Sequence, residues 1–383
     1  MITGEIRETE FTAAKCNLLN IPFLKKLFLW KGFPFIIQIP ILIVLSSLIV
    51  SGWGLYAPKG TDTELFGNTN IVCLLIWGIW WPLMIISVVL LGRIWCSICP
   101  LELVSRISEK IGQVFHVKQA GLNKTLRNGA VLLALYFLIH LLIEGTDADD
   151  VPAYTAFFLT GIITLSIFTG FFFKNGALCK AFCPISLTLN AYSRRSMLAV
   201  RPESEAECVE CRDKNCVGVC PSNIYPPYLK SSQDCLLCGK CLKSCKSGNV
   251  QLLLRLPFNK SDIGEKTASW ILTLFIMMDS GFVCGELAEQ WQISNNIFFK
   301  LPQLFAAYFG LQVYSNWIEI TWSMLIFPLI LWTIWGLIMK LLSKPSGTLT
   351  TIWRNYAFRI VVISSSGHIL RSLMKIWDLN LFH

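Results

Sequence analysis

Charged residues are scarce in this sequence of 383 residues. Asp, Glu, Lys and Arg make up only 15% of it, whereas 54% is hydrophobic, with 14 Trp and 25 Phe. A soluble domain of this length needs more polar surface to cover its core, so the composition excludes that class. It is typical of a polytopic α-helical membrane protein.

Two common cofactor motifs are also absent. There is no Cys-x2-Cys-His for covalent c-type haem and no Gly-x-Gly-x-x-Gly after a strand-like run for a dinucleotide. The net charge is +9, but Lys and Arg gather in short segments that flank apolar runs. This placement indicates membrane orientation, and we expect no nucleic acid partner.

Seven apolar runs approach or exceed the twenty or so residues that a transmembrane helix needs. They are residues 35–56, 71–91, 126–144, 156–173, 270–287, 320–342 and 351–373. Arg and His side chains interrupt the last run, so six or seven spans are expected. The connectors alternate between basic and acidic, and the positive-inside rule assigns the basic side to the cytoplasm of a bacterial inner membrane.

This pattern predicts four segments. Residues 1–33 form a cytoplasmic tail without a cleavable signal, and residues 34–200 form a membrane half with four spans. Residues 201–252 are polar and dense in Cys, and they predict a small α+β ferredoxin-like module inserted before a second membrane half of two or three spans at 266–383. About fifty residues bury little core, so such a module depends on bound metal for its fold.

The cysteines of the module follow an iron–sulfur pattern. The stretches "CVECRDKNCVGVCP" and "CLLCGKCLKSC" each carry four Cys, and in such motifs the first three bind one cubane cluster while the fourth reaches its neighbour. One [4Fe-4S] cluster is therefore expected on Cys208, Cys211, Cys216 and Cys245. The second is expected on Cys235, Cys238, Cys241 and Cys220. Zinc sites would not need this interleaved order.

Two further Cys pairs follow apolar runs, in "GRIWCSICPLEL" and "GALCKAFCPISL". Each Pro suits the first turn of a following helix, and a thiol at a helix N-terminus has a lowered pKa. The four thiols can therefore meet under the membrane. A third [4Fe-4S] cluster, a redox-active disulfide or transient metal site, and unligated thiols all remain open for Cys96, Cys99, Cys179 and Cys183.

With these motifs the chain resembles the membrane polyferredoxins of the NapH, NosR and CcoG kind. The resemblance covers about residues 35–248, and Cys179 and Cys183 match the family's Cys-x3-Cys-Pro, whereas Cys96 and Cys99 are one residue closer together. It implies electron transfer between the quinone pool and partner reductases, or a role in metal reduction and oxidase assembly.

Ionisable residues inside apolar runs are costly and are candidates for function. Asp279, His140 and Glu144 are predicted proton acceptors beside a quinone, because quinol oxidation releases protons. His140 and His368 together are alternative ligands of a b-type haem. The third interpretation is that these side chains are simply packed or reach towards the membrane surface.

The sequence thus predicts a membrane-bound electron-transfer subunit. All-Cys clusters exchange single electrons and leave no open position for group transfer, so whether the chain is itself an enzyme stays open. The expected partners are membrane lipid, a quinone and a partner redox protein. The alternatives are a cupric reductase or assembly factor for a respiratory oxidase, and a redox-sensing membrane regulator.

Overall fold

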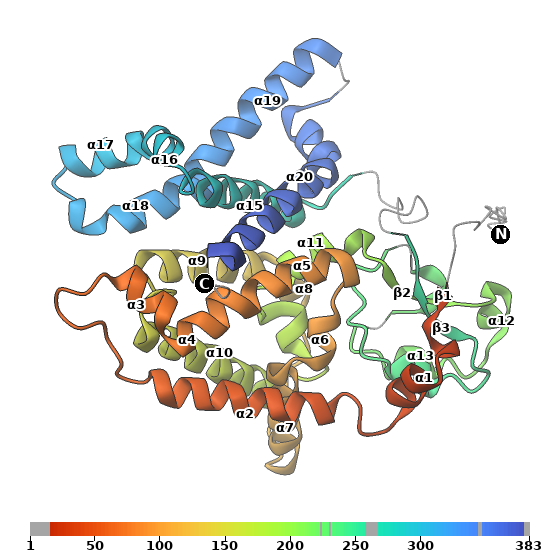
Figure 1. Cartoon of the computed structure of the whole chain (residues 1–383). Helices are drawn as coiled ribbons and strands as arrows, with labels where there is room; N and C mark the ends of the chain where they lie inside the picture. The colour runs from red at the N-terminus through yellow and green to blue at the C-terminus, as the bar shows by residue number, and fades with distance from the viewer. Residues whose placement is uncertain (1–15, 223, 230, 257–266, 344–346, 379–383) are drawn as a thin grey trace.

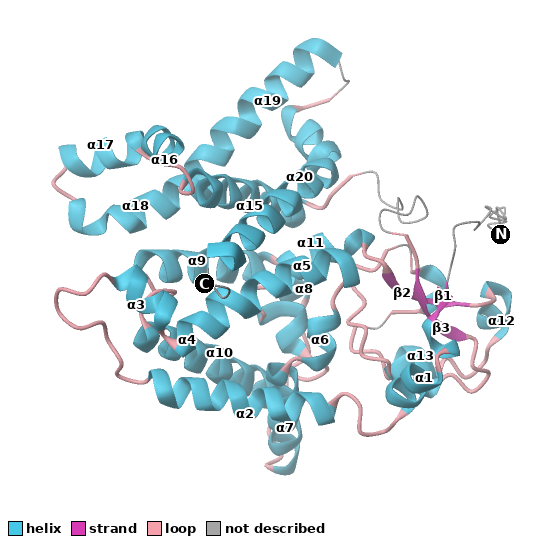
Figure 2. Cartoon of the chain, viewed as in Figure 1, coloured by secondary structure: helices cyan, strands magenta, loops and turns pink. Residues whose placement is uncertain are grey.

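The computed structural model describes residues 16–222, 224–229, 231–256, 267–343 and 347–378. Residues 1–15 of the predicted tail and residue 266, the predicted start of the second membrane half, lie outside these ranges. The described chain is mostly helical, with a small sheet at one end (Figures 1 and 2). Five helices are long and apolar enough to cross a membrane. They are Phe35–Gly52, Ile71–Leu91, Pro152–Phe172, Trp270–Ala288 and Gln312–Leu342.

Most of the helices lie on either side of the Cys-rich segment in the chain. The first membrane half contains α2 (Phe35–Gly52), α3 (Thr63–Thr69), α4 (Ile71–Cys73), η2 (Leu74–Trp80), α5 (Trp81–Leu91), α6 (Ile94–Ile98), α7 (Pro100–Val114), α8 (Lys124–Arg127), α9 (Ala130–Gly145), α10 (Pro152–Phe172), η3 (Leu178–Phe182), α11 (Ser186–Tyr192) and η4 (Ser193–Arg195). The second contains α15 (Trp270–Ala288), α16 (Gln292–Phe298), α17 (Lys300–Tyr308), η7 (Gln312–Tyr314), α18 (Ser315–Thr321), η8 (Trp322–Ile326), α19 (Phe327–Ser343) and α20 (Leu349–Asp378).

Two of the predicted runs give helices that are not among these five spans. The run at 126–144 gives the shorter α9, because Gly129 takes a left-handed conformation just before it. The interrupted run at 351–373 gives one helix of 30 residues, α20. Its charges have partners: Arg354 Nε donates to the carbonyl of Ala268 at 2.8 Å, and Arg371 Nε lies 2.9 Å from Glu286 Oε2.

Helix α15 forms the centre of the membrane part. It is the most buried of the five apolar spans, with 67% of its window inside the protein. A Cβ on Gly281 would come within 2.1 Å of the carbonyl oxygen of Ser323, so α15 and η8 approach at backbone distance. Phe275 and Ile276 of α15 join Met84 and Met324 in the largest hydrophobic cluster.

The Cys-rich module is built around three antiparallel strands. Its elements are β1 (Cys16–Asn17), η1 (Leu18–Asn20), α1 (Pro22–Leu29), β2 (Leu198–Pro202), α12 (Glu205–Glu210), α13 (Asn215–Gly218), η5 (Pro226–Tyr228), α14 (Lys240–Ser244) and β3 (Val250–Leu254). The strand order is β1-β3-β2, and Cys16 pairs with Leu254. The described end of the predicted tail is therefore part of the module, where it covers an otherwise open strand edge.

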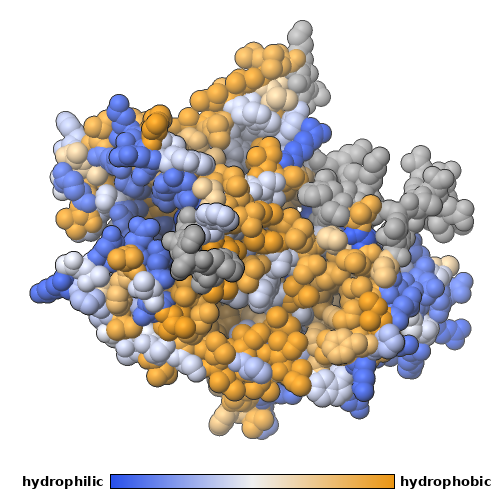
Figure 3. All heavy atoms as spheres, in the orientation of Figure 1, coloured by the Kyte–Doolittle hydropathy of each residue, from blue (hydrophilic) through white to orange (hydrophobic). Residues whose placement is uncertain are grey.

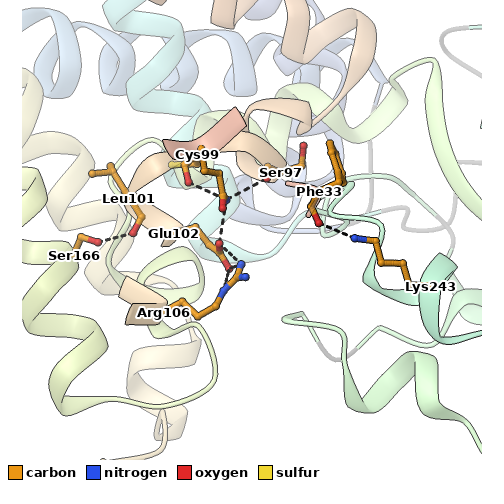
Figure 4. Close-up of polar contacts among 9 residues, drawn as sticks. Phe33, Ser97, Cys99, Leu101, Glu102, Arg106, Ser166 and Lys243 are labelled. Carbon is orange, nitrogen blue, oxygen red and sulfur yellow. Dashed lines mark hydrogen bonds and ion pairs between the residues drawn. The ribbon is translucent and has the colours of Figure 1, made fainter. Parts of the chain in front are cut away.

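The module packs directly on the ends of the apolar helices. The backbone N–H of Met197 donates to Leu90 at 2.7 Å, and Lys243 Nζ donates to the carbonyl of Phe33 at 2.7 Å (Figure 4). Gly92 ends α5 with φ +76°, and a Cβ there would lie 2.7 Å from Ser196 Oγ. The junction is thus a tight contact between α5 and the start of β2.

Hydrophobicity is distributed in a band. In Figure 3 hydrophobic residues cover the middle of the molecule, and hydrophilic residues gather at the module and at the opposite end, around α3 and α18. On α2 the apolar side chains of Ile36, Ile39, Ile43 and Val50 are exposed. Such a surface is stable in a lipid bilayer and not in water.

Candidate functional site

The first group of module thiols is the one that the interleaved pattern predicts. Burial raises the pKa of the Cys208 thiol, and the charges of Cys245, Cys216 and Cys211 raise it further, so these four sulfurs are neighbours. Cys245 has a lowered pKa in spite of its burial, because the Ser247 hydroxyl and the backbone N–H groups of residues 248–250 donate hydrogen bonds to its sulfur. Such donors stabilise a thiolate ligand.

The second group has the remaining module thiols. Burial raises the pKa of the Cys241 thiol, and Cys235, Cys238 and Cys220 raise it further. Cys220 comes from the first motif, and its sulfur accepts a hydrogen bond of 3.5 Å from the backbone N–H of Ile224. The fourth Cys of each motif therefore lies beside the first three of the other.

The two Cys pairs next to the apolar helices meet at one point. Burial raises the pKa of the Cys179 thiol well above its usual range, and Cys183, Cys96 and Cys99 raise it further. Cys96 lies on α6, Cys99 directly before α7, and Cys179 in the π-helical turn η3. Turns of this kind occur often at functional sites.

Two details of this third group differ from the sequence-based expectation. Burial raises the pKa of both Cys99 and Cys183 to about 12, so the lowered thiol pKa expected at helix N-termini is wrong. Pro100 does begin α7, as predicted, but Pro184 lies in a turn before α11. Buried thiols become thiolates only when a cation compensates the charge, which bound iron would do.

One cation already lies beside these thiols. Arg93 is 5% exposed and adjoins the sulfurs of Cys96, Cys179 and Cys183. Its Nη1 donates to the carbonyl of Gln233 at 3.2 Å and its Nη2 to Ser186 Oγ at 3.2 Å. A buried guanidinium beside sulfur ligands compensates the net negative charge of an all-thiolate cluster.

The opposite side of the third group is also polar. Gln38, fully buried in α2, donates through Nε2 to the carbonyls of Cys99 at 3.2 Å and Ser97 at 3.3 Å. Gln38 Nε2 also donates to Glu102 Oε2 at 3.3 Å, and Glu102 pairs with Arg106 one helical turn later (Figure 4). The loop that presents Cys99 is thus fixed by hydrogen bonds from Gln38 of α2, and the residues present fit a bound cluster.

Within the described ranges, no three His, Cys, Asp or Glu side chains converge closely enough to hold a single metal ion. A single ion draws its thiolates to about 2.3 Å. A cubane cluster lies between its four thiolates and keeps them further apart.

A separate polar network lies within the apolar helices. Asp279 on α15 is completely buried and accepts hydrogen bonds from Tyr136 at 3.2 Å, from Tyr192 at 2.8 Å and from Ser364. Tyr192 is also 3.2 Å from Nδ1 of His368. Four helices, α9, α11, α15 and α20, therefore meet at one carboxyl group.

The three predicted proton acceptors do not all lie together. His140 reaches the network, because its ring packs 4.2 Å from that of Tyr136 and its Nδ1 lies 2.8 Å from the backbone carbonyl of the same residue. Glu144 lies instead in a cavity of about 420 Å³ at the end of the bundle opposite the module. This cavity is lined by carboxylates, among them Asp150, Glu286 and Glu289.

The geometry gives little support to a haem. His140 and His368 both pack against Phe282 and Trp81, with His–ring centroid distances of 4.6 to 6.5 Å. The cavity beside Phe282 is the acidic one, whereas a haem needs an apolar slot. The haem ligation of these two residues stays a prediction without structural support.

Sequence reasoning missed Tyr136, Tyr192, Ser364 and Arg93. The first and third were readable from spacing, since Tyr136 precedes His140 by four residues and Ser364 precedes His368 by four, which places each pair on one helix face. Tyr192 and Arg93 gave no such signal, because their partners come from distant parts of the chain.

Comparison with protein families finds a 4Fe-4S binding domain at residues 74–118. The only thiols in this range are Cys96 and Cys99, so the match falls on the first Cys-Pro motif and not on the module. A cluster at this place needs two further ligands, and the third group supplies Cys179 and Cys183.

The similar curated proteins each match less than half of this chain. Two uncharacterized proteins of Methanocaldococcus jannaschii are 26% and 24% identical over 43% and 41% of this chain. The ferredoxin-type protein NapH of Haemophilus influenzae is 25% identical over 41%. These matches span 73%, 63% and 61% of the three proteins, in that order. No solved structure matches significantly.

The chain is therefore similar to membrane polyferredoxins, and it contains a segment that matches a 4Fe-4S binding domain.

Proposed function

We propose that this chain is a membrane-bound electron carrier that exchanges electrons between a quinone and a partner redox protein through three [4Fe-4S] clusters. The observation that carries the proposal is the meeting of Cys96, Cys99, Cys179 and Cys183 directly beside the module. Two of these thiols belong to the matched 4Fe-4S domain, and the other two complete the four ligands that a cubane requires.

In this proposal the second group of thiols passes electrons between the other two. Lys180 is adjacent to both Cys179 of the third group and Cys220 of the second group. Cys211 of the first group is exposed. This order gives an electron path from the membrane thiols, through the second group, to the first group at the protein surface, where a partner can dock.

The module belongs on the cytoplasmic side in this proposal. The connectors at its end carry Lys118, Lys124, Arg127 and Lys174, whereas the loops at the opposite end carry Asp147, Asp149 and Asp150. The positive-inside rule places the basic end in the cytoplasm of a bacterial inner membrane. Reduced thiols and oxygen-sensitive clusters are also favoured there.

A mixing experiment tests the proposal. The purified full-length protein, reconstituted with iron and sulfide and fully reduced without oxygen, is mixed with a soluble naphthoquinone while cluster absorbance and EPR are followed. Rapid oxidation of the clusters is expected. If the clusters stay reduced with quinone and are oxidised by cupric ion, the protein is a metal reductase. If neither acceptor oxidises them, a redox-sensing regulator is the remaining interpretation.

A further inference from the structure

A cavity that adjoins Cys179 has a volume of about 700 Å³, which is within the size range of sites for small organic ligands. It lies between the module and the ends of α9 and α15 nearest to it. Cys179 of the third group lines it on one side, and Pro221, which follows Cys220 of the second group, on the other. A molecule bound here would adjoin two of the three thiol groups.

The walls of this cavity divide into an apolar and a polar part. The apolar part comes from Leu132 of α9, Leu187 of α11 and Ile271 and Leu272 of α15. The helices α9 and α15 continue from here into the hydrophobic band. The polar part comes from other elements and contains the residues Arg93, Arg127, Lys174, Lys180, Asn190 and Asp234.

One polar atom in this wall lacks a partner. Arg93 is 5% exposed, and its Nε has no hydrogen-bond partner among the residues that the structure describes. A buried guanidinium N–H without an acceptor is costly, and both the Cys96 sulfur and the oxygen of a bound ligand can serve as its acceptor. The same guanidinium adjoins the sulfurs of Cys96, Cys179 and Cys183.

The Asp279 network is a poorer place for a quinone. Both oxygens of Asp279 are occupied by hydroxyl donors, and Asp279 is 0% exposed. A ligand would have to break these bonds. The hydrogen bonds of this network also join four helices, which is expected of a group that stabilises the fold.

We infer that the cavity between Cys179, Pro221 and Leu272 binds the ring of a quinone or quinol, with the ring oxygens towards Arg93 and the apolar side towards α9 and α15. This inference rests on the proposed function and assigns its membrane substrate a place. It replaces Asp279 as the quinone contact and leaves Asp279 as a structural group.

The electron count balances with the clusters as acceptors. Oxidation of one quinol breaks its two O–H bonds, sends two protons to water and gives two electrons. Two oxidised clusters each take one of these electrons. Quinone reduction is the reverse. Positive side chains around the ring stabilise the semiquinone anion that forms after the first electron.

Photolabelling tests the site. The full-length, cluster-loaded protein is illuminated with an azido-naphthoquinone without oxygen, and labelled peptides are identified by mass spectrometry. Labels are expected in residues 127–132 and 271–272. Leu272→Trp fills the cavity and should lower the labelling affinity about tenfold. Leu274→Trp makes the same change two residues later, at an exposed position outside the cavity, and should leave labelling unchanged.

A second pair of variants guards against misfolding. Arg127→Glu reverses an exposed charge in the cavity wall, and Lys124→Glu makes a similar change three residues earlier, outside it. Only Arg127→Glu should weaken labelling, with the cluster absorbance of both variants unchanged.

The other outcomes are distinguishable. Labels around Asp279 and His140 that persist in Leu272→Trp overturn the site and leave the quinone function standing. Labelling of the cavity that an anionic phospholipid displaces, but an unlabelled quinone does not, overturns it in favour of a lipid headgroup. If quinone neither labels the protein nor oxidises its clusters, the proposed function fails as well.

Discussion

The hydroxyl group of Tyr192 lies 2.8 Å from Oδ2 of Asp279 and 3.2 Å from Nδ1 of His368. Tyr192 stands at the end of α11, immediately before the chain enters the module, whereas Asp279 and His368 belong to the second membrane half. One side chain therefore ties the two membrane halves together across the inserted module.

Removal of this hydroxyl should destabilise the membrane part. Tyr192→Phe leaves a buried carboxyl with one donor fewer and should cost about 1–3 kcal/mol of unfolding free energy. Unfolding in mixed micelles, followed by tryptophan fluorescence, measures the loss. Tyr154→Phe, at a 40% exposed position, is the control and should have little effect. Equal stability of the two variants would contradict the role given to Tyr192.

The contact between α5 and the module depends on Gly92. Gly92→Ala places a methyl group 2.7 Å from Ser196 Oγ at a residue with φ +76°, so the module should detach more readily. Limited proteolysis of residues 201–252 should become several-fold faster. In the control Gly161→Ala, the added methyl group has no packing neighbour within 4 Å, so this variant should be cleaved at the normal rate. Resistance of the Gly92 variant would show that the junction is looser than described.

Much of the membrane architecture is predictable from the sequence. The run at 71–91 and the observed apolar helix share the same bounds, and the grouping of Cys220 with Cys235, Cys238 and Cys241 follows the interleaved pattern. These features depend on local hydrophobicity and spacing. Strand β1 was not predictable, because two residues from the tail pair with β3 only after the chain has folded.

The candidate site was predictable only in part, because local motifs can be read from the sequence but contacts between distant segments cannot. The Cys pairs are visible as motifs, but the raised pKa of Cys99 depends on burial by segments that the local sequence does not reveal. Likewise, Arg93 is one basic residue among many in the sequence, and only the fold places it against three thiols.

Arg93 should set the reduction potential of the cluster next to it. Removal of a buried positive charge disfavours the more negative, reduced cluster, so Arg93→Gln should lower its potential. A redox titration followed by EPR measures the shift. Arg93→Lys retains the charge and should restore most of the potential. Lys124→Gln, outside the site, should not change it. An unchanged potential in Arg93→Gln would contradict the electrostatic role that is assigned to Arg93.

The acidic cavity should make stability depend on pH. Burial, with the charge of Asp149, raises the pKa of Asp150 from 3.8 to about 7. The folded state then holds its proton more tightly than the unfolded chain does, so stability falls as pH rises from about 4 to 7. Thermal unfolding at pH 5 and pH 8 should show a smaller difference in Asp150→Asn than in the wild type. Glu205→Gln, exposed in the module, is the control.

The central claim is that four thiols from two distant motifs hold a third cluster. Iron analysis combined with EPR spin quantification of the fully reduced protein, prepared without oxygen, tests it most directly. The wild type should contain about twelve irons per chain, and Cys179→Ser should contain about eight, with the signals of the module clusters retained. Cys284→Ser, on α15 away from the site, should keep about twelve. About eight irons in the wild type, unchanged in Cys179→Ser, would contradict the claim.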